Sequence, residues 1–277
     1  MHNENKTPKL YVWPNYGLFL GTRFVPLSTY SVTSDQFLLV IEGEIVKTKQ
    51  TGEKISLRSL LIRAGATVEM EAVDASTAVI AVFYLDPLTQ ACNALQAPMI
   101  KSTKQFFYNH PREQEMIATC LWLRDNNLTP QEVEHHFQQM LGPMEENITQ
   151  NRKLDPRAVK IMQLIRDTIT ENHTIAEFAE RVHMSDSRLR KLFKSEFGVP
   201  ITRYRLGHRI ITGVLHMATG ANVTNAALAA GFASTAHFSK CFRAVTGIHL
   251  SHMFLRPPFM DVYIDPGMMQ GLQGQVA

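Results

Sequence analysis

The chain has 277 residues, enough for two domains of about 100 to 200 residues each. It is 45% hydrophobic and 19% charged, a composition typical of globular proteins. It contains no run of about 18 apolar residues that could span a bilayer. The first six residues are polar and lack the apolar segment of a secretory signal, and the three cysteines lie far apart. We therefore expect a cytoplasmic protein with no membrane association.

The charges are divided unevenly along the chain. Residues 1–150 hold 12 Lys and Arg against 16 Asp and Glu, whereas residues 151–256 hold 16 against 7. The overall charge of +3 therefore combines an acidic first half with a strongly basic block. A basic block of this kind is typical of a domain that meets a polyanion, and a solvated basic surface is the alternative explanation.

Residues 10–85 have the pattern of short strands. Apolar or β-branched runs at 37–41, 44–48, 60–62 and 78–84 are separated by turn signals at 42–43, 51–52 and 64–65. The pattern predicts a small antiparallel barrel or sandwich. The side chains expected to line its interior are Phe19, Phe37, Leu39, Ile41, Val82 and Tyr84. This interior either encloses a small ligand or is filled by these side chains themselves.

The period changes after residue 87. Apolar residues recur three and four positions apart around Met116 and Phe137, and a capping box at Thr129 to Glu132 opens a helix. Amphipathic helices of this kind pack on the barrel or form a dimer seam. The polar residues 142–154 resemble a linker, which places a domain boundary near residue 150.

A two-helix motif follows a helix predicted from Asp155 to near Asn172. Thr174 begins a short helix through a capping box with Glu177. Ser185 caps the next helix, which ends at Gly198. Two short helices joined by a tight turn predict a helix-turn-helix unit.

The motif recurs 49 residues later, where Ser234, Phe238, Phe242 and Gly247 repeat Ser185, Leu189, Phe193 and Gly198. We expect Thr224 to cap the first helix of this copy and the chain to turn at 231–232. A bridging helix over 201–217 joins the copies, and Gly213 is expected to weaken or kink it.

The outward faces of the two second helices carry the candidate DNA-reading groups. Arginine and lysine can reach guanine, serine and threonine can bond to several bases, and helix N-termini can bind phosphate. A solvated helix surface is the alternative for each residue. The predicted DNA-binding residues are Ser185, Ser187, Arg190, Lys191, Lys194, Ser234, Thr235, Ala236, Ser239, Lys240 and Arg243.

Residues 155–256 resemble the DNA-binding domain of the AraC/XylS family of bacterial transcription regulators. The matching pieces include Phe178-Ala179, Met184-Ser185, Leu192-Phe193, Phe197-Gly198-Val199-Pro200, Gly231-Phe232 and His237-Phe238-Ser239-Lys240. The resemblance implies about seven helices with two helix-turn-helix units on an asymmetric promoter site, and activation through RNA polymerase. This chain departs from the family pattern at His249-Leu250, Asn225, Gly213 and His216.

The first half resembles the cupin-type sensor barrel of the same regulators. Cupin enzymes hold a metal through histidines on barrel strands, but this chain has no histidine between His2 and His110. His237 and Cys241 stand four residues apart, and a buried thiol explains that cysteine better than a metal ligand. We therefore predict no catalytic residue, cofactor or metal site.

The sequence as a whole predicts an α+β chain of two domains: a cupin-like barrel with a helical extension, then an all-α domain with two helix-turn-helix motifs. The expected divisions are a regulatory barrel over 1–86, a helical dimerisation or linker region over 87–150, the DNA-binding domain over 151–256 and a weakly ordered tail over 257–277. The expected function is a transcription activator on promoter DNA, controlled by a small-molecule or protein effector or by homodimerisation. A barrel enzyme with a DNA-binding appendage and a non-specific architectural DNA-binding protein are the alternatives.

Overall fold

The structure is a computed structural model that describes residues 7–22, 28–48, 52, 54–70, 73–75, 77–86, 89, 91–142, 154–254 and 260–268. Its strands are β1 Lys9–Val12, β2 Tyr16–Thr22, β3 Tyr30–Ser31, β4 Asp35–Glu42, β5 Ile45–Thr48, β6 Lys54–Leu57, β7 Ser59–Ile62, β8 Thr67–Val68, β9 Val73–Asp74, β10 Val79–Leu85, β11 Ile100–Lys101, β12 Phe106–Tyr108 and β13 Asp261–Ile264. Its helices are α1 Ala91–Gln96, α2 Glu113–Asp125, α3 Pro130–Leu141, α4 Pro156–Asp167, α5 Ile175–Glu180, α6 Asp186–Phe197, α7 Ile201–Ala218, α8 Val223–Ala229, α9 Thr235–Thr246 and α10 Leu250–Phe254.

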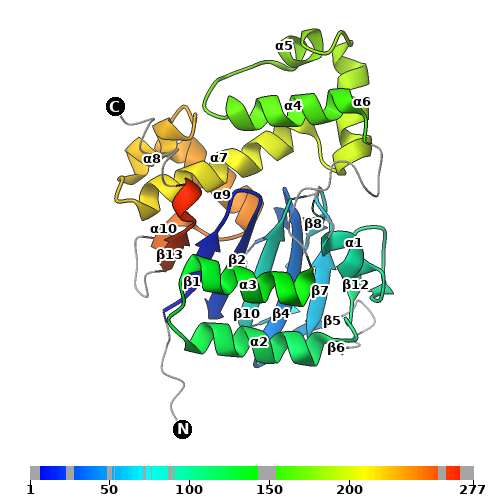
Figure 1. Ribbon diagram of the computed structural model, residues 1–277, viewed down its shortest axis with the longest axis vertical. Helices are drawn as coiled ribbons and strands as arrows, with labels where there is room; N and C mark the ends of the chain where they lie inside the picture. Colours follow the sequence, from blue (N-terminus) through cyan, green and yellow to red (C-terminus); the bar gives the residue numbers. More distant parts are fainter. Residues whose placement is uncertain are drawn as a thin grey trace.

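Most strands precede most helices along the chain, and the molecule has two parts (Figure 1). We call β1–β12 with α1–α3 the sheet domain and α4–α10 the helical domain. The main sheet has the order β11-β12-β7-β4-β10-β2-β1-β13, and two small sheets, β3-β8 and β6-β5-β9, complete the strands. Among the described residues, no helix is both long and apolar enough to cross a membrane.

Strand β10 lies near the middle of the main sheet and is buried on both faces. It pairs antiparallel with β2 and β4, and its sequence is an almost continuous apolar run. Because successive side chains point to opposite faces, Ala81 and Phe83 enter one hydrophobic cluster while Ile80 and Val82 enter another. The sheet therefore has two covered faces.

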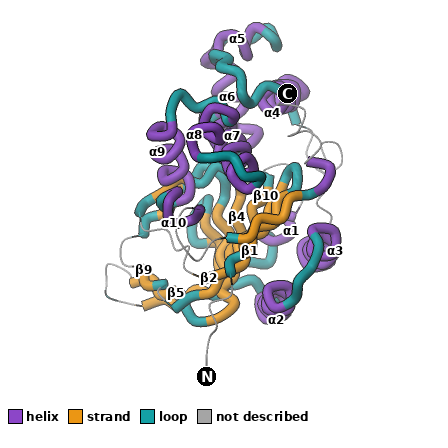
Figure 2. Tube along the Cα trace, turned by 90° about the vertical axis from the view of Figure 1, so that its left-hand side faces the viewer, coloured by secondary structure: helices purple, strands orange, loops and turns teal. Residues whose placement is uncertain are grey.

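Helices α2 and α3 cover the first face (Figure 2). Helix α3 begins at the predicted capping box, in which Thr129 and Glu132 satisfy each other's backbone N–H groups. Its buried Phe137 meets Phe83 of β10 edge to face, with ring centroids 5.0 Å apart. Burial of such aromatic rings against the sheet fixes the position of the helix pair.

The helical domain covers the second face. Phe19 and Val82 from strands share a cluster with Ile210, Val214 and Phe242 from α7 and α9. The two domains therefore share one hydrophobic core.

Three expectations from the sequence are corrected here. Residues 100–101 and 106–108, expected to be helical, form β11 and β12, because Phe106 to Tyr108 pair antiparallel with β7. Part of the expected weakly ordered tail is also a strand, because Val262-Tyr263-Ile264 is β-forming and the edge of β1 pairs with it. The helix from Pro156 ends at Asp167, before Asn172. The expected linker over 143–153 and the tail beyond 268 lie outside the described residues.

Helix α7 is unbroken over 18 residues despite its two glycines. A Cβ atom at Gly213 would lie 2.6 Å from Cζ of Phe238, and one at Gly207 would lie 2.5 Å from Oγ1 of Thr33. These glycines therefore allow α9 and the sheet domain to approach α7 closely. The expectation that Gly213 weakens or kinks the helix is wrong, because this glycine makes room for the packing of Phe238.

We predict that Gly213→Ala destabilises the protein. Contact of the new methyl with Phe238 costs about 1 to 3 kcal/mol, whereas the better helix propensity of alanine recovers about 1 kcal/mol. The expected net loss, measured by urea unfolding, is about 1 kcal/mol. Thr202→Ala, at an exposed site on the same helix, is the control. A loss that is equally large in a Phe238→Leu background would contradict the explanation, because the smaller side chain should relieve the contact.

Candidate nucleic-acid interface

The first two-helix unit consists of α5 and α6. Thr174 Oγ1 accepts a hydrogen bond from the Glu177 N–H, and the Glu177 carboxylate accepts one from the Thr174 N–H, so α5 begins at the predicted capping box. In the turn, His183 has a left-handed φ of 53°, and the Met184 N–H donates to the Ala179 carbonyl at 3.0 Å. This bond closes the tight turn between the helices.

Helix α6 buries one face against α4 and α7. Leu189, Phe193 and Phe197 are buried, and the helix ends at Gly198, whose φ of 73° suits a left-handed cap. Ser185 precedes the helix as predicted, but its side chain makes no capping bond. The opposite face of α6 is left in solvent.

The second unit repeats the first. Helix α9 has the same 12-residue length as α6, buries Phe238 and Phe242, and ends at Gly247 with φ 72°. Ser234 caps it by accepting from the His237 N–H at 3.1 Å. The first helix of this copy is capped by Asn222, not by Thr224 as expected, because the Asn222 carboxamide oxygen accepts from the Asn225 N–H at 2.9 Å.

The predicted DNA-binding residues lie on the two free faces. Two of them, Thr235 and Ser239, are half-buried. Two further residues of these helices are exposed: Arg188, which is not in the predicted set, and His237, which the sequence suggested only as a possible metal ligand with Cys241. The exposed members of the predicted set are Ser185, Ser187, Arg190, Lys191, Lys194, Ser234, Ala236, Lys240 and Arg243.

The sheet domain contacts α4 and α7 of the helical domain through a polar cluster. The Asp86 carboxylate after β10 accepts hydrogen bonds from the Arg166 guanidinium of α4 at 2.9 Å and from the Tyr204 hydroxyl of α7 at 3.1 Å. Arg166 also donates to the Tyr204 oxygen at 2.9 Å. Burial, together with the Asp86 charge, raises the pKa of Tyr204 well above its usual value. The tyrosine therefore stays a neutral donor.

Both second helices touch the sheet domain at their C-terminal ends. At α6, the contact is so close that a Cβ on Gly65 would lie 2.8 Å from the Gly198 carbonyl oxygen. At α9, the Ser28 hydroxyl donates to the Gly247 carbonyl at 3.3 Å and accepts from Arg243 Nε at 3.4 Å. The N-terminal ends, which carry most of the exposed candidates, point away from these contacts.

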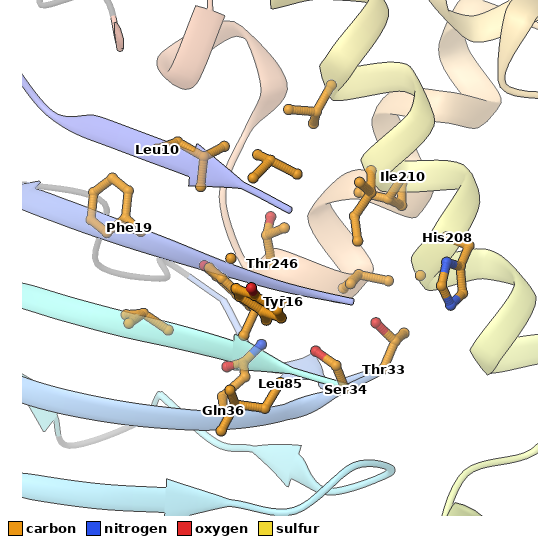
Figure 3. A pocket seen from close by; sticks show the side chains of 18 of the residues that line it. Leu10, Tyr16, Phe19, Thr33, Ser34, Gln36, Leu85, His208, Ile210 and Thr246 are labelled. Carbon is orange, nitrogen blue, oxygen red and sulfur yellow. The ribbon is translucent and has the colours of Figure 1, made fainter. Parts of the chain in front are cut away.

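A cavity of about 190 Å³ lies between the two domains (Figure 3). Of the expected interior residues, Phe19, Val82 and Tyr84 line it, whereas Phe37, Leu39 and Ile41 belong to the core under α2 and α3. The two sets point to opposite faces of the sheet, because successive side chains of a strand alternate between its faces. The strand pattern in the sequence did not assign the residues to these two faces. The helical domain contributes the remaining wall, including Ile210, Val214, Phe242, Val245, Ile248 and Met253.

His208 of α7 borders this cavity beside Tyr204, with ring centroids 4.6 Å apart. Burial lowers the pKa of His208 from 6.5 to about 4, so the ring is neutral at neutral pH. The charge of the Asp86 carboxylate raises the pKa of His208, whereas the charge of the Arg166 guanidinium lowers it.

The described residues contain no grouping of three potential metal ligands. Cys241 is half-buried, in place of the buried position expected, and burial raises the pKa of its thiol.

We predict that His208 makes stability depend on pH. Because its folded pKa lies below the unfolded value, the unfolded chain binds more protons between pH 6.5 and 4, and stability falls as pH drops through this window. His208→Gln should reduce that loss by about 2 kcal/mol when urea unfolding is compared at pH 7 and pH 4. Thr202→Ala, a change between uncharged residues at an exposed site of the same helix, should keep the wild-type slope. An unchanged slope in His208→Gln would contradict the prediction.

Comparison with known proteins supports the assignment of this region. Residues 178–256 match the helix-turn-helix domain family. The transcriptional regulator GbdR from two strains of Pseudomonas aeruginosa is 33% identical over 94 residues, which is 34% of this chain and 26% of GbdR. The chain thus matches about a quarter of the length of these relatives.

Solved structures of ToxT from Vibrio cholerae share the two-domain fold. One crystal form superposes with a TM-score of 0.50 at 16% identity, covering 86% of this chain and 96% of ToxT. A ligand-free ToxT variant gives 0.50 at 15% identity, with coverages of 91% and 98%. Residues 178–256 therefore form a domain that matches the helix-turn-helix family and is similar to part of the transcriptional regulator GbdR.

Proposed function

We propose that the chain is a sequence-specific DNA-binding transcription regulator that acts as an activator. The observation that carries this proposal is the pair of matched helix-turn-helix units with two equal second helices, α6 and α9, each free on its outward face. The relationship to GbdR supports it. Double-stranded promoter DNA and RNA polymerase are the proposed partners, and no enzymatic role is assigned.

Helix α7 sets the separation of the two units. Its 18 residues span about 27 Å at 1.5 Å per residue, and successive major grooves on one face of DNA lie about 34 Å apart. Each unit would place its second helix in one groove. The basic side chains at Arg190, Lys191 and Lys240 would then reach base edges or phosphates.

We propose the cavity between the domains as the effector site. Its wall is mostly apolar, with a few polar groups from Tyr16, Thr33, Gln36 and His208. Cavities of about 150 Å³ lined by apolar side chains hold benzene, so this one suits a small, largely apolar molecule. Because α9 contributes Phe242 and Val245 to the wall, occupancy would change how the second unit sits on the sheet domain.

A protein effector or homodimerisation through residues 87–150 is the alternative route of control. Trp122 on α2 is 46% exposed and packs edge to face on His136 of α3, which favours this helix pair as the dimer surface.

Selection of duplexes from a random pool by the full chain tests the proposed function. An enriched asymmetric site with two blocks about one helical turn apart, bound with a steep salt dependence, is the expected result. Equal affinity for enriched and random duplexes would instead indicate an architectural DNA-binding protein.

We predict that Arg190→Ala and Lys240→Ala each weaken binding to the selected duplex by about 1 to 3 kcal/mol, because each removes an exposed cation from a reading helix. A residue that reads a base should also lose preference at one position, whereas a phosphate contact should weaken all sequences alike. Lys104→Ala, at an exposed lysine of the sheet domain, is the charge-matched control. Unchanged binding in both variants would exclude these faces as the interface.

We also predict that toluene raises the melting temperature of the wild type and not that of Val82→Phe, since the larger ring fills the cavity and stabilisation requires an available site. Leu228→Phe, at a side chain 59% exposed, should respond like the wild type. Equal stabilisation of all three proteins would place the binding of toluene elsewhere.

A further inference from the structure

Strand β13 lies at one edge of the main sheet, beside β1. Strand β13 follows the helical domain and pairs parallel with β1, with Lys9 opposite Asp261 and Val12 opposite Ile264 (Figure 1). The Asp261 N–H donates to the Pro8 carbonyl at 2.8 Å, and the Asp265 N–H donates to the Val12 carbonyl at 2.9 Å. The segment after α10 is therefore attached to the sheet domain.

Side chains on both faces of β13 strengthen this attachment. Tyr263 stacks on Tyr11 with ring centroids 4.7 Å apart and planes 14° from parallel, on the face covered by α2 and α3. Val262 packs with Leu10 into the core shared with the helical domain. Met260, just before the strand, is 9% exposed and lines the cavity. The strand thus joins both cores and closes one side of the cavity.

Attachment of β13 restricts the second helix-turn-helix unit. Seven residue steps separate Phe254, the end of α10, from Asp261, and a fully extended chain of that length spans about 25 Å. While β13 stays paired, the end of α10 at Phe254 cannot move farther than this from the edge of the sheet, and α9 is connected to the sheet edge through α10. In the same arrangement, Ser28 of the sheet domain holds Arg243, one of the candidate DNA-binding residues.

The attachment is nevertheless confined to one side of β13, which is an edge strand of the main sheet. β13 is a four-residue parallel strand at an edge, its first residue is exposed and its other three are half-buried. Short edge elements with little buried area open locally without global unfolding. β13 can therefore leave while β1 remains paired with β2.

We propose that β13 is a releasable clasp that holds the second helix-turn-helix unit on the sheet domain and keeps it from its full contact with DNA. Its release frees α9, removes Met260 from the cavity wall and lets Arg243 leave Ser28. The proposal rests on the proposed DNA-binding function and specifies how the sheet domain restrains it.

Two pairs of variants test the clasp in the full chain. Asp261→Pro removes the donor to Pro8, and Asp261→Ala keeps it, so their difference isolates one backbone bond. Leu10→Cys/Val262→Cys places cysteines at paired positions of neighbouring strands, where a disulfide can form and is verified by mass. The single-cysteine variants are the controls.

We expect Asp261→Pro to bind the selected duplex about fivefold or more tightly than Asp261→Ala. The oxidised double-cysteine protein should bind about fivefold or more weakly than the same protein reduced. Equal affinities in both comparisons would overturn the proposal and leave β13 a structural edge strand. If Asp261→Pro does not fold, the oxidised and reduced comparison decides by itself.

Hydrogen exchange separates failure of the clasp from failure of the DNA-binding function. Without DNA, α9 amides should exchange faster in Asp261→Pro than in Asp261→Ala, and slower in the oxidised double-cysteine protein than in its reduced form. Identical α9 exchange in locked and released proteins would overturn the clasp whether or not a duplex is found. If the exchange differences are observed but no duplex is selected from the pool, the DNA-binding function alone is overturned.

Discussion

Close packing of α7 against both the sheet domain and α9 is the constraint on which the rest of the structure depends. The helix can lie this near to its neighbours only where a side chain is missing, at Gly207 facing Thr33 and at Gly213 facing Phe238. Ile210, between these points, and Val214, directly after Gly213, enter the core shared with the strands. A bulkier residue at either glycine would push apart the surfaces that define the cavity and the orientation of the second unit.

A buried charge is neutralised where α4 and α7 meet the sheet domain. Asp86 is buried and would be costly there without partners, but Arg166 and Tyr204 supply a cation and a hydroxyl. These partners come from α4 and α7, so the cluster exists only while the domains are docked. The hydrogen bonds of this cluster fix the orientation of the two domains more strictly than the apolar packing of α7, which has little directional preference.

The sheet domain contacts α6 and α9 at the C-terminal ends of these helices. Helix α6 contacts the 64–65 turn through Gly198, and α9 contacts Ser28 through Gly247 and Arg243. The buried side of α9 also forms part of the cavity wall. A change in the sheet domain can thus reach the reading helices through packed side chains, without altering the exposed residues that would contact DNA.

The sequence by itself determined the local elements of this protein. Capping boxes at Thr129 and Thr174, left-handed glycines at 198 and 247, and the 49-residue repeat define helix ends and helix faces through short-range hydrogen bonds and periodicity. These signals sufficed for both helix-turn-helix units and for the main strands. Only the tertiary structure decided the cavity, the packing role of Gly213 and the strand at 261–264, because each depends on atoms far away in the chain. A glycine in a helix costs stability until a ring from another helix occupies its place, and a four-residue strand has no stability until β1 presents its edge.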